Sequence, residues 1–496
     1  MATKANTSNE SVIPLLVIGA GPHALALVLN LLEEDSSAEF TEPETVKMSF
    51  WRSKLRGRHL SKRDLRRSIR VLDPSGTWCS TWNCNFATFG ISHLRSPVSV
   101  HLDPLRPDGL RDYAVATNQL ETQVSDPPQS IHIGQRSREF TNNTSIFNET
   151  DRQFLGCPSQ KLFAAFNRQL VKQYGLDTLV QKTRAKTIEH LPDRTFRVTC
   201  DDGATLLAKN VVVAIGTLNI PRIPTWATPL RATDAKANVI HSSELVHDPT
   251  FPKRVRHKSI LVIGGGLTSV HLTRQMLKWG AHHVTLATRK ATLIVQPYDV
   301  PLDWLSPLLR QKKLAEFYAK ETPEAKLACI REARRGGSVT KAALTDMQAV
   351  TTPDNFELLP NTTVNRVEQT ADGRLHVEFK SSSMQVDVIV LATGGDIDVA
   401  KEPLFDRVRD ASPVIVGGLP GLDADLRWAL GMNLFVMGTY AALQMGPVAG
   451  NLMGARSGAN RLGEILLEEL LPRNEQTRQH HLRALCGKEN LYDLLL

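Results

Sequence analysis

The chain has 496 residues, of which 42% are hydrophobic and 22% charged, which excludes a disordered protein and predicts two or three globular domains. Six cysteines, none of them spaced as zinc ligands, exclude a disulfide scaffold and favour a reducing compartment, the cytoplasm. The net charge of +8 comes from residues 52–70, which hold nine of the 59 Lys and Arg residues and one of the 51 acids, so the rest of the chain is balanced.

The first predicted elements are a strand, a turn and a helix within LLVIGAGPHALALVLNLL (15–32). Gly19 and Gly21 interrupt this stretch, and the polar residues 1–11 carry one lysine, so we expect neither a membrane span nor a signal peptide. The pattern Gly19-x-Gly21-x-x-Ala24 is typical of a dinucleotide-binding unit. Gly19 allows the tight turn, Gly21 lets the backbone approach a pyrophosphate, and Ala24 permits close packing of helix on strand.

An acid that binds the adenine ribose usually follows the second strand of such a unit. The expected distance falls on VKMSFWR (46–52), which contains no acid, whereas the next strand-like run, IRVLDPSGTW, supplies Asp73. We therefore prefer Asp73 as the ribose ligand and treat residues 33–68 as an insertion. Its basic run 52–70 is a solvated surface, a contact for an acidic partner or an anionic membrane surface, or a nuclear-import signal. No nucleic-acid-binding motif accompanies it.

The stretch DPSGTWCSTWNCNF (73–86) permits two interpretations. Cys79 and Cys84 have the spacing of the redox-active dithiol of flavin disulfide reductases, whereas Gly76-Thr77-Trp78 resembles the Gly-x-Trp turn of flavin monooxygenases. Trp78 shifts the cysteines by one residue from the reductase pattern, and the end of the chain is too short for the reductase interface domain. This favours Cys79 and Cys84 as packing residues and places Trp78 near the flavin.

A second strand, turn and helix follow in KSILVIGGGLTSVHLTRQMLKWGAHHVTLATRK (258–290). The pattern is Gly264-x-Gly266-x-x-Ser269, and two such units predict two bound dinucleotides. The second strand of this unit ends in Thr288-Arg289-Lys290 without an acid. Because a basic side chain here accommodates a 2′-phosphate, Arg289 and Lys290 favour NADPH over NADH.

The remaining elements connect the two units. Two buried strands, in 208–224 and 386–400, end in Ala-x-Gly, which places Gly216 and Gly394 close to a dinucleotide or at a crossing between domains. Residues 297–350 read as two helices with a break at Gly336-Gly337 and form the expected substrate lid. Arg334 or Arg335 is a candidate for binding a substrate carboxylate, against the alternative of a solvated helix end.

This arrangement resembles the flavin monooxygenase superfamily over nearly the whole chain, especially the lysine/ornithine N-hydroxylating group. Gly19-x-Gly21-Pro22 is similar to the opening motif of that group, and Asp387-x-x-x-Leu391-Ala392-Thr393-Gly394 is similar to its Asp-x-x-x-Leu-Ala-Thr-Gly element. The segments 94–104 and 443–456, the latter with Gly446 and Pro447, resemble bacterial FAD/NAD(P)-binding hydroxylase-like proteins and the oxidative-stress-induced growth inhibitors of animals.

The sequence also departs from the family. Gly395 replaces a tyrosine after the Asp-to-Gly element, and only His241 remains of the Baeyer–Villiger fingerprint, so Baeyer–Villiger chemistry is not expected. No Ser/His/Asp or metal-binding set stands out, and no catalytic residue can be assigned.

The resemblance implies an α/β fold with two Rossmann-like domains. Residues 1–225 and 385–496 would form a split FAD domain ending in a helical tail, and residues 226–384 the inserted NADPH domain. The helix after Gly438 would turn its N-terminal amides to the flavin. NADPH would reduce FAD, and the C4a-peroxide formed with O2 would oxygenate an N, S or C centre of a small molecule. An NADPH oxidase, a flavin disulfide reductase and a non-catalytic nucleotide-binding regulator are the alternatives.

Overall fold

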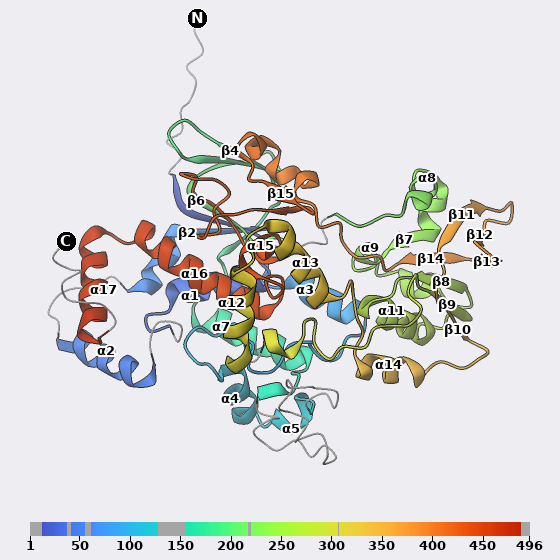
Figure 1. Cartoon of the computed structure of the whole chain (residues 1–496), viewed down its shortest axis with the longest axis horizontal. Coiled ribbons are helices and arrows are strands. Elements are labelled where there is room, and N and C mark those ends of the chain that lie inside the picture. Colours follow the sequence, from blue (N-terminus) through green and yellow to red (C-terminus); the bar gives the residue numbers. More distant parts are fainter. Residues whose placement is uncertain are drawn as a thin grey trace, which may run out of the picture.

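A computed structural model describes residues 12–36, 41–54, 61–126, 154–216, 220–305 and 307–487. Two bodies, each built on its own sheet, lie next to each other along the long axis of the molecule (Figure 1). Helices cover both sheets, so the expected α/β fold class with two Rossmann-like units is confirmed.

The first sheet carries the N-terminal glycine turn. Its parallel part has the order β3-β2-β1-β6-β17, with β1 between β2 and β6. Val17 of β1 lies opposite Val71 and Val212, and all three side chains are fully buried, as expected of a strand covered on both faces. The strands are β1 (Ile13–Ile18), β2 (Ile69–Asp73), β3 (Val180–Lys182), β6 (Thr205–Val213) and β17 (Leu434–Val436).

An antiparallel meander extends this sheet. Strands β4 (Ala185–His190) and β5 (Phe196–Cys200) precede β6, and the first half of β6 pairs with β5 while its second half pairs with β17. The turn between β5 and β6 lies at Asp202–Gly203, with Gly203 at φ +84°. The meander therefore belongs to the same sheet as the glycine turn.

The second sheet is entirely parallel and has the order β10-β9-β8-β14-β7. The strand that leads into the second glycine turn, β8, lies at the centre of this sheet between β9 and β14, as in a doubly wound fold. The strands are β7 (Val239–His241), β8 (Ser259–Ile263), β9 (His283–Ala287), β10 (Phe356–Leu359) and β14 (Val388–Leu391).

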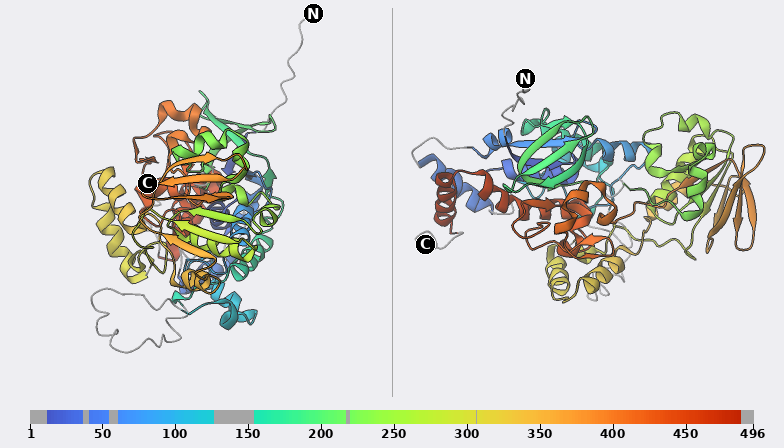
Figure 2. Two further views of the ribbon diagram at one scale, coloured as in Figure 1. Left: turned by 90° about the vertical axis from the view of Figure 1, so that its right-hand side faces the viewer. Right: turned by 90° about the horizontal axis from the view of Figure 1, so that it is seen from above.

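A small antiparallel sheet of β11 (Val364–Gln369), β12 (Leu375–Phe379) and β13 (Ser383–Val386) lies at the far end of this second body (Figure 2). The helices α2 (Glu42–Lys54) and α17 (Arg473–Leu485) form the opposite end of the molecule. No helix among the described residues has the length and apolar character that crossing a membrane requires.

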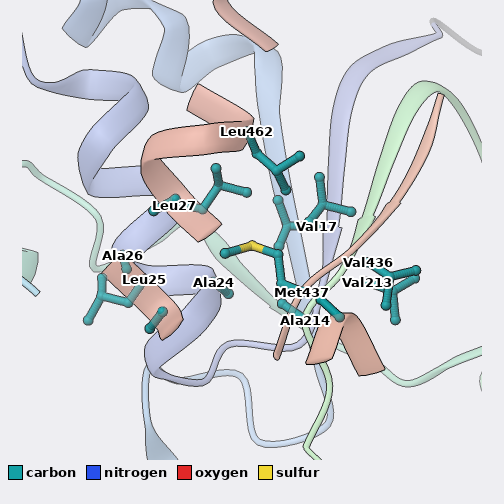
Figure 3. Packing of buried hydrophobic residues seen from close by; sticks show 14 of the residues in the cluster. Val17, Ala24, Leu25, Ala26, Leu27, Val213, Ala214, Val436, Met437 and Leu462 are labelled. Atoms are coloured by element: carbon teal, nitrogen blue, oxygen red, sulfur yellow. The ribbon is translucent and has the colours of Figure 1, made fainter. Parts of the chain in front are cut away.

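The core of the first body is formed by α1 (Pro22–Leu32) and α16 (Leu452–Leu470), which pack against each other beside the sheet (Figure 3). Small residues of α16 allow this close approach. A β-carbon placed on Gly463 would lie 2.1 Å from Asn30 Oδ1, and Asn30 donates from Nδ2 to Asn460 Oδ1 at 3.0 Å. Residues separated by more than 400 positions thus fix the first helix after the glycine turn.

Residues 33–68 lie between α1 and β2 and contain α2 and the 3-10 helix η1 (Lys62–Ser68). The run 46–52, which had been one possible second strand, is helical in α2, and residues 55–60 of the basic run lie outside the described residues. Because β2 begins at Ile69, Asp73 is the residue that ends the second strand of the first unit.

The expected lid region contains three helices among its described residues rather than two. These are α12 (Pro307–Tyr318), α13 (Pro323–Arg334) and α14 (Lys341–Gln348), and the Gly336–Gly337 break separates the last two. The other α-helices are α3 (Ser80–Thr88), α4 (Gly109–Ala116), α5 (Leu120–Gln123), α7 (Gln160–Gln173), α8 (Thr228–Arg231), α9 (Ser242–Leu245), α10 (Phe251–Arg254), α11 (Leu267–Lys278) and α15 (Ala442–Met445).

Candidate functional site

The first glycine turn connects β1 to α1. Gly19 has φ +101°, and a β-carbon there would lie 2.7 Å from the carbonyl oxygen of Ala214, so only glycine fits. Gly21 is the N-cap of α1, and no atom lies within 4 Å of the place where its β-carbon would be. The amides of His23 and Ala24, in the first helical turn, have no acceptor within the helix. This open space and these amides fit a pyrophosphate.

Asp73 lies at the carboxyl end of β2, beside this turn. Its Oδ2 accepts from the Ala20 amide at 3.0 Å, and its Oδ1 accepts from the amide and hydroxyl of Ser75. The carboxylate therefore holds the glycine turn and the following loop together. Each oxygen has two lone pairs, so a ribose hydroxyl can still donate to Asp73.

The structure does not support a redox-active dithiol at Cys79 and Cys84. Both thiols are free, Cys79 is buried and Cys84 is exposed. Burial, and then the nearby Asp73 carboxylate, raise the pKa of Cys79 to about 12, which suppresses its thiolate. The Cys79 amide donates to Ala20 O at 2.7 Å and Trp78 Nε1 donates to Leu176 O at 3.0 Å, so both residues support the turn.

His23 is a site residue that the sequence analysis did not single out. Its ring lies in the first turn of α1 and is hydrogen-bonded to the Gly450 backbone, while the buried Nδ1 has no partner in the described part of the protein. Burial lowers the pKa of His23 to about 4, so the ring is neutral. A β-carbon on Gly438 would lie 4.0 Å from Nδ1, which places His23 opposite the start of η8 (Gly438–Ala441). His23 is the second residue after Gly21, and its burial, which indicates its role, cannot be seen in the sequence.

The second glycine turn connects β8 to α11. A β-carbon on Gly264 would lie 2.5 Å from Ala392 O, and Gly266 is the N-cap of α11. The fully buried Ser269 donates from Oγ to Gly266 O at 2.7 Å, so its small side chain closes the turn. The second unit thus has a close glycine turn that leads into a helix, while the contact of these residues with a dinucleotide stays a prediction.

The two basic residues after β9 have different surroundings. Arg289 is exposed, and its side chain makes no hydrogen bond to the described residues. Lys290 is half-buried, and its Nζ donates to the carbonyl oxygens of Arg335, Gly336 and Gly337 at 3.2, 3.3 and 2.7 Å. Burial and the adjacent Arg289 lower the pKa of Lys290. Of the two predicted phosphate ligands, Lys290 is therefore bound to carbonyl oxygens, whereas Arg289 has no acceptor among the described residues.

The segments that follow β6 and β14 cross between the two bodies side by side. The Arg222 amide donates to Gly394 O at 2.9 Å and the Asp396 amide donates to Ile220 O at 2.7 Å, forming a short antiparallel pair that we call the crossing ribbon (220–222 and 393–396). Strands of a parallel sheet end at a common edge. The carboxyl edges of both sheets, and hence both glycine turns, therefore face the crossing ribbon.

Asp387 and His241, which the family motifs highlighted, have structural roles here. Asp387 Oδ2 accepts from the Ser259 amide at 2.7 Å, which fixes the register of β14 against β8. The fully buried His241 contacts Gly394 O through Nε2 at 3.1 Å and caps α9 through Nδ1. Both residues thus support the strand and glycine that enter the crossing ribbon.

The C-terminal strand β17 leads into the last predicted cofactor contacts. Gly438 and Gly446 have φ +79° and +78°, and a β-carbon on Gly446 would lie 3.4 Å from the Trp304 ring. Arg334 donates to Pro447 O at 2.8 Å and lies 3.6 Å from Asp299. Arg334 therefore ties the helical segment to the Gly446–Pro447 turn. Arg335 is exposed at the end of α13.

Gly216 follows β6, with no atom within 4 Å of its β-carbon position, as at Gly394. Two hollows among the described residues lie elsewhere. One of about 210 Å³ lies between α16 and α17, and one of about 410 Å³ lies between α8 and β11. Neither touches a glycine turn, so the glycine turns rather than these hollows define the candidate site.

The sequence profile of the L-lysine 6-monooxygenase/L-ornithine 5-monooxygenase family matches residues 167–396. No curated protein sequence matches the chain. Among solved structures, the FAD-bound cadaverine monooxygenase DfoA of Erwinia amylovora is 16% identical, with a TM-score of 0.63 over 94% of this chain and 97% of that chain.

Two ornithine hydroxylases are similarly related. The enzyme PvdA of Pseudomonas aeruginosa is 17% identical, with a TM-score of 0.63 over 93% of this chain and 100% of that chain. The N-hydroxylase KtzI of Kutzneria sp. 744, solved with reduced FAD, NADP+ and L-ornithine, is 15% identical, with a TM-score of 0.63 over 92% and 99%. At these identities the likeness concerns the fold.

Proposed function

We propose that this chain, a member of the flavin monooxygenase superfamily, is an FAD-dependent, NADPH-using enzyme that oxygenates a nitrogen centre of a small molecule. The family profile and the shared fold support this proposal, and the FAD and NADP+ bound in the structures of similar fold support the two expected cofactors. One observation supports the proposed activity most directly. The two glycine turns, one for each dinucleotide, lie at two sheet edges that both face the crossing ribbon.

The residues of the chain hold and orient the reactants. The amides at the start of α1 would bind the FAD pyrophosphate and Asp73 its ribose, while the amides at the start of α11 and Arg289 would bind NADPH. FAD, reduced by NADPH and reoxidised by O2, supplies the oxygen-transfer chemistry. The protein excludes water there, because the fully or nearly fully buried Phe317 and Trp304 cover the Gly446 turn.

The first test is the visible spectrum of the purified protein. We expect a yellow protein that NADPH bleaches faster than NADH without oxygen, and that forms a hydroxylamine from lysine, ornithine or cadaverine when air is admitted. Bleaching followed by release of hydrogen peroxide with every amine offered would instead indicate an NADPH oxidase. A colourless protein that cannot be loaded with FAD would overturn the enzymatic function and leave a regulator.

The variant Gly21→Val separates cofactor loss from misfolding. Gly21 has an extended backbone that valine adopts, and its β-carbon position is open, so the protein should fold with an unchanged circular dichroism spectrum. The added side chain fills the space that a pyrophosphate needs, and we expect the variant to be colourless. The exposed turn variant Gly203→Asn is the matched control and should stay yellow.

A further inference from the structure

The nucleotide site of the second body is partly covered by the turn that joins α13 to α14. A β-carbon built on Gly266 would lie 3.9 Å from the Cα of Gly337, so Gly337 lies across the side of Gly266 that has no side chain. Gly266 is the glycine past which a pyrophosphate must approach the α11 N-terminus. A pyrophosphate that approaches Gly266 from this side would therefore meet Gly337.

Lys290 holds this turn in place. Arg335, Gly336 and Gly337 have φ values of +52°, +60° and +93°, a tight left-handed arrangement that points all three carbonyl oxygens toward one ammonium group. The residues on either side of the turn are anchored separately. Arg334 bonds to Pro447 O, and the buried Ser338 accepts from Arg95 at both its hydroxyl and its carbonyl oxygen. Only the three residues between these anchors are free to move.

We infer that Lys290 and the Arg335–Gly337 turn form a latch over the NADPH site, and that the 2′-phosphate of NADPH opens it by drawing Lys290 away from the three carbonyl oxygens. This inference rests on the proposed function, because it assumes that α11 binds NADPH. A phosphate dianion is a stronger acceptor for an ammonium group than neutral carbonyls are. NADH has no 2′-phosphate, so it must displace the same turn without giving Lys290 a new acceptor. The latch therefore favours the binding of NADPH over that of NADH.

The latch makes an unusual prediction for Lys290→Met. We expect the dissociation constant for NADP+ to rise by roughly tenfold to a hundredfold, since a charge-assisted contact to the phosphate is lost. At the same time the dissociation constant for NAD+ should fall, because the turn no longer has to be released. Arg289→Met is the matched control: it also weakens NADP+ binding, but it leaves NAD+ binding unchanged. Isothermal titration calorimetry measures all four constants without turnover.

Trypsin cleavage after the exposed Arg335 reports the turn directly. In the wild type we expect NADP+ to accelerate this cleavage at a lower concentration than NAD+ does, because either nucleotide must displace the turn, and in Lys290→Met we expect rapid cleavage without nucleotide. Unchanged NAD+ affinity and unchanged cleavage in Lys290→Met would overturn the latch and leave Lys290 a plain phosphate ligand. If the wild type binds neither nucleotide, the proposed function fails, which is a different result from binding without release of the turn.

Discussion

At the scale of single residues, His23 is expected to lower the stability of the FAD-free protein and to favour the binding of FAD. Its buried Nδ1 is an acceptor without a donor among the described residues. A buried polar atom without a hydrogen bond costs about 1–3 kcal/mol. The nearby Gly438 and the first turn of α1 place this atom where FAD is proposed to lie. A hydroxyl group of FAD would supply the missing donor.

We therefore expect His23→Phe to act in opposite directions on two measurements. The aromatic ring keeps the packing and removes the unsatisfied nitrogen, so the melting temperature of the FAD-free protein should rise or stay equal. The affinity for FAD, measured by quenching of flavin fluorescence, should fall by roughly fivefold to tenfold for one lost hydrogen bond. An unchanged FAD affinity would contradict a role for His23 at the cofactor.

The sequence predicted which residues form the glycine turns, but it did not predict the hydrogen-bond acceptors of the charged side chains. The Gly-x-Gly-x-x-Ala/Ser motif points to Gly19, Gly264 and Ser269 directly. The atoms that exclude a β-carbon at the two glycines, Ala214 O and Ala392 O, lie far away in chain order. The surroundings of Lys290 and Arg334 could not be predicted, because their acceptors lie 45 or more residues away in chain order. His23 was missed because a histidine in an apolar helix gives no signal until its burial is known.

At the scale of elements, the contact between α1 and α16 depends on small residues. Gly463→Ala places a β-carbon 2.1 Å from Asn30 Oδ1, a side chain already bonded to Asn460 and Ser36. We expect a loss of about 1–3 kcal/mol in the free energy of unfolding, which overpacking causes and which exceeds the helix propensity gained. Urea denaturation measures it.

The double variant Gly463→Ala with Asn30→Ala is the informative control. Asn30→Ala removes the oxygen that the new methyl group meets, so the two substitutions together should cost less than the sum of the single ones. Simple additivity would show that the methyl group meets no obstacle at Asn30 and would contradict the described packing of α1 on α16.

Helix α2 contains residues 46–52, which the motif spacing made one possible second strand, although the strand that ends at Asp73 was preferred. In VKMSFWR the apolar residues alternate, which suits a strand, yet Val46 and Phe50 are 67% and 54% exposed and only Met48 is buried. Met48 packs against Leu482 and Cys486, near the other end of the chain. A local pattern cannot anticipate such a partner, and the same limit explains why the lid region has one helix more than expected.

At the scale of the whole molecule, Phe89 joins the two bodies. It comes from a segment of the first body, but its side chain packs in the core of the second. It follows α3 of the first body, yet it is 5% exposed within the core cluster that contains Leu272 and Met276 of α11. The next residue, Gly90, accepts from Arg274 of α11 at 3.0 Å. This contact lies apart from the crossing ribbon and joins the two bodies a second time.

We expect Phe89→Ala to lower the free energy of unfolding by roughly 3 kcal/mol, as is usual for an emptied aromatic site. Since the lost packing lies between the bodies, calorimetry should resolve a single unfolding transition of the wild type into two. Phe50→Ala, at an exposed site of α2, is the control and should change stability by less than about 0.5 kcal/mol. Equal effects of the two variants would show that Phe89 does not join the bodies.

Arg95 provides a third attachment, through hydrogen bonds to the carbonyl oxygens of Gln296, Tyr298 and Ser338. Proteins that open by hinge closure swing one domain about a few flexible residues, on a timescale of microseconds to milliseconds. A boundary fastened by the crossing ribbon, by Phe89 and by Arg95 opposes such a swing. If the proposed function and latch hold, exchange of the nicotinamide nucleotide would depend on the three-residue turn at Gly337, and loops of this size move within nanoseconds to microseconds. The protein would then exchange NADP+ for NADPH without exposing the flavin to bulk water.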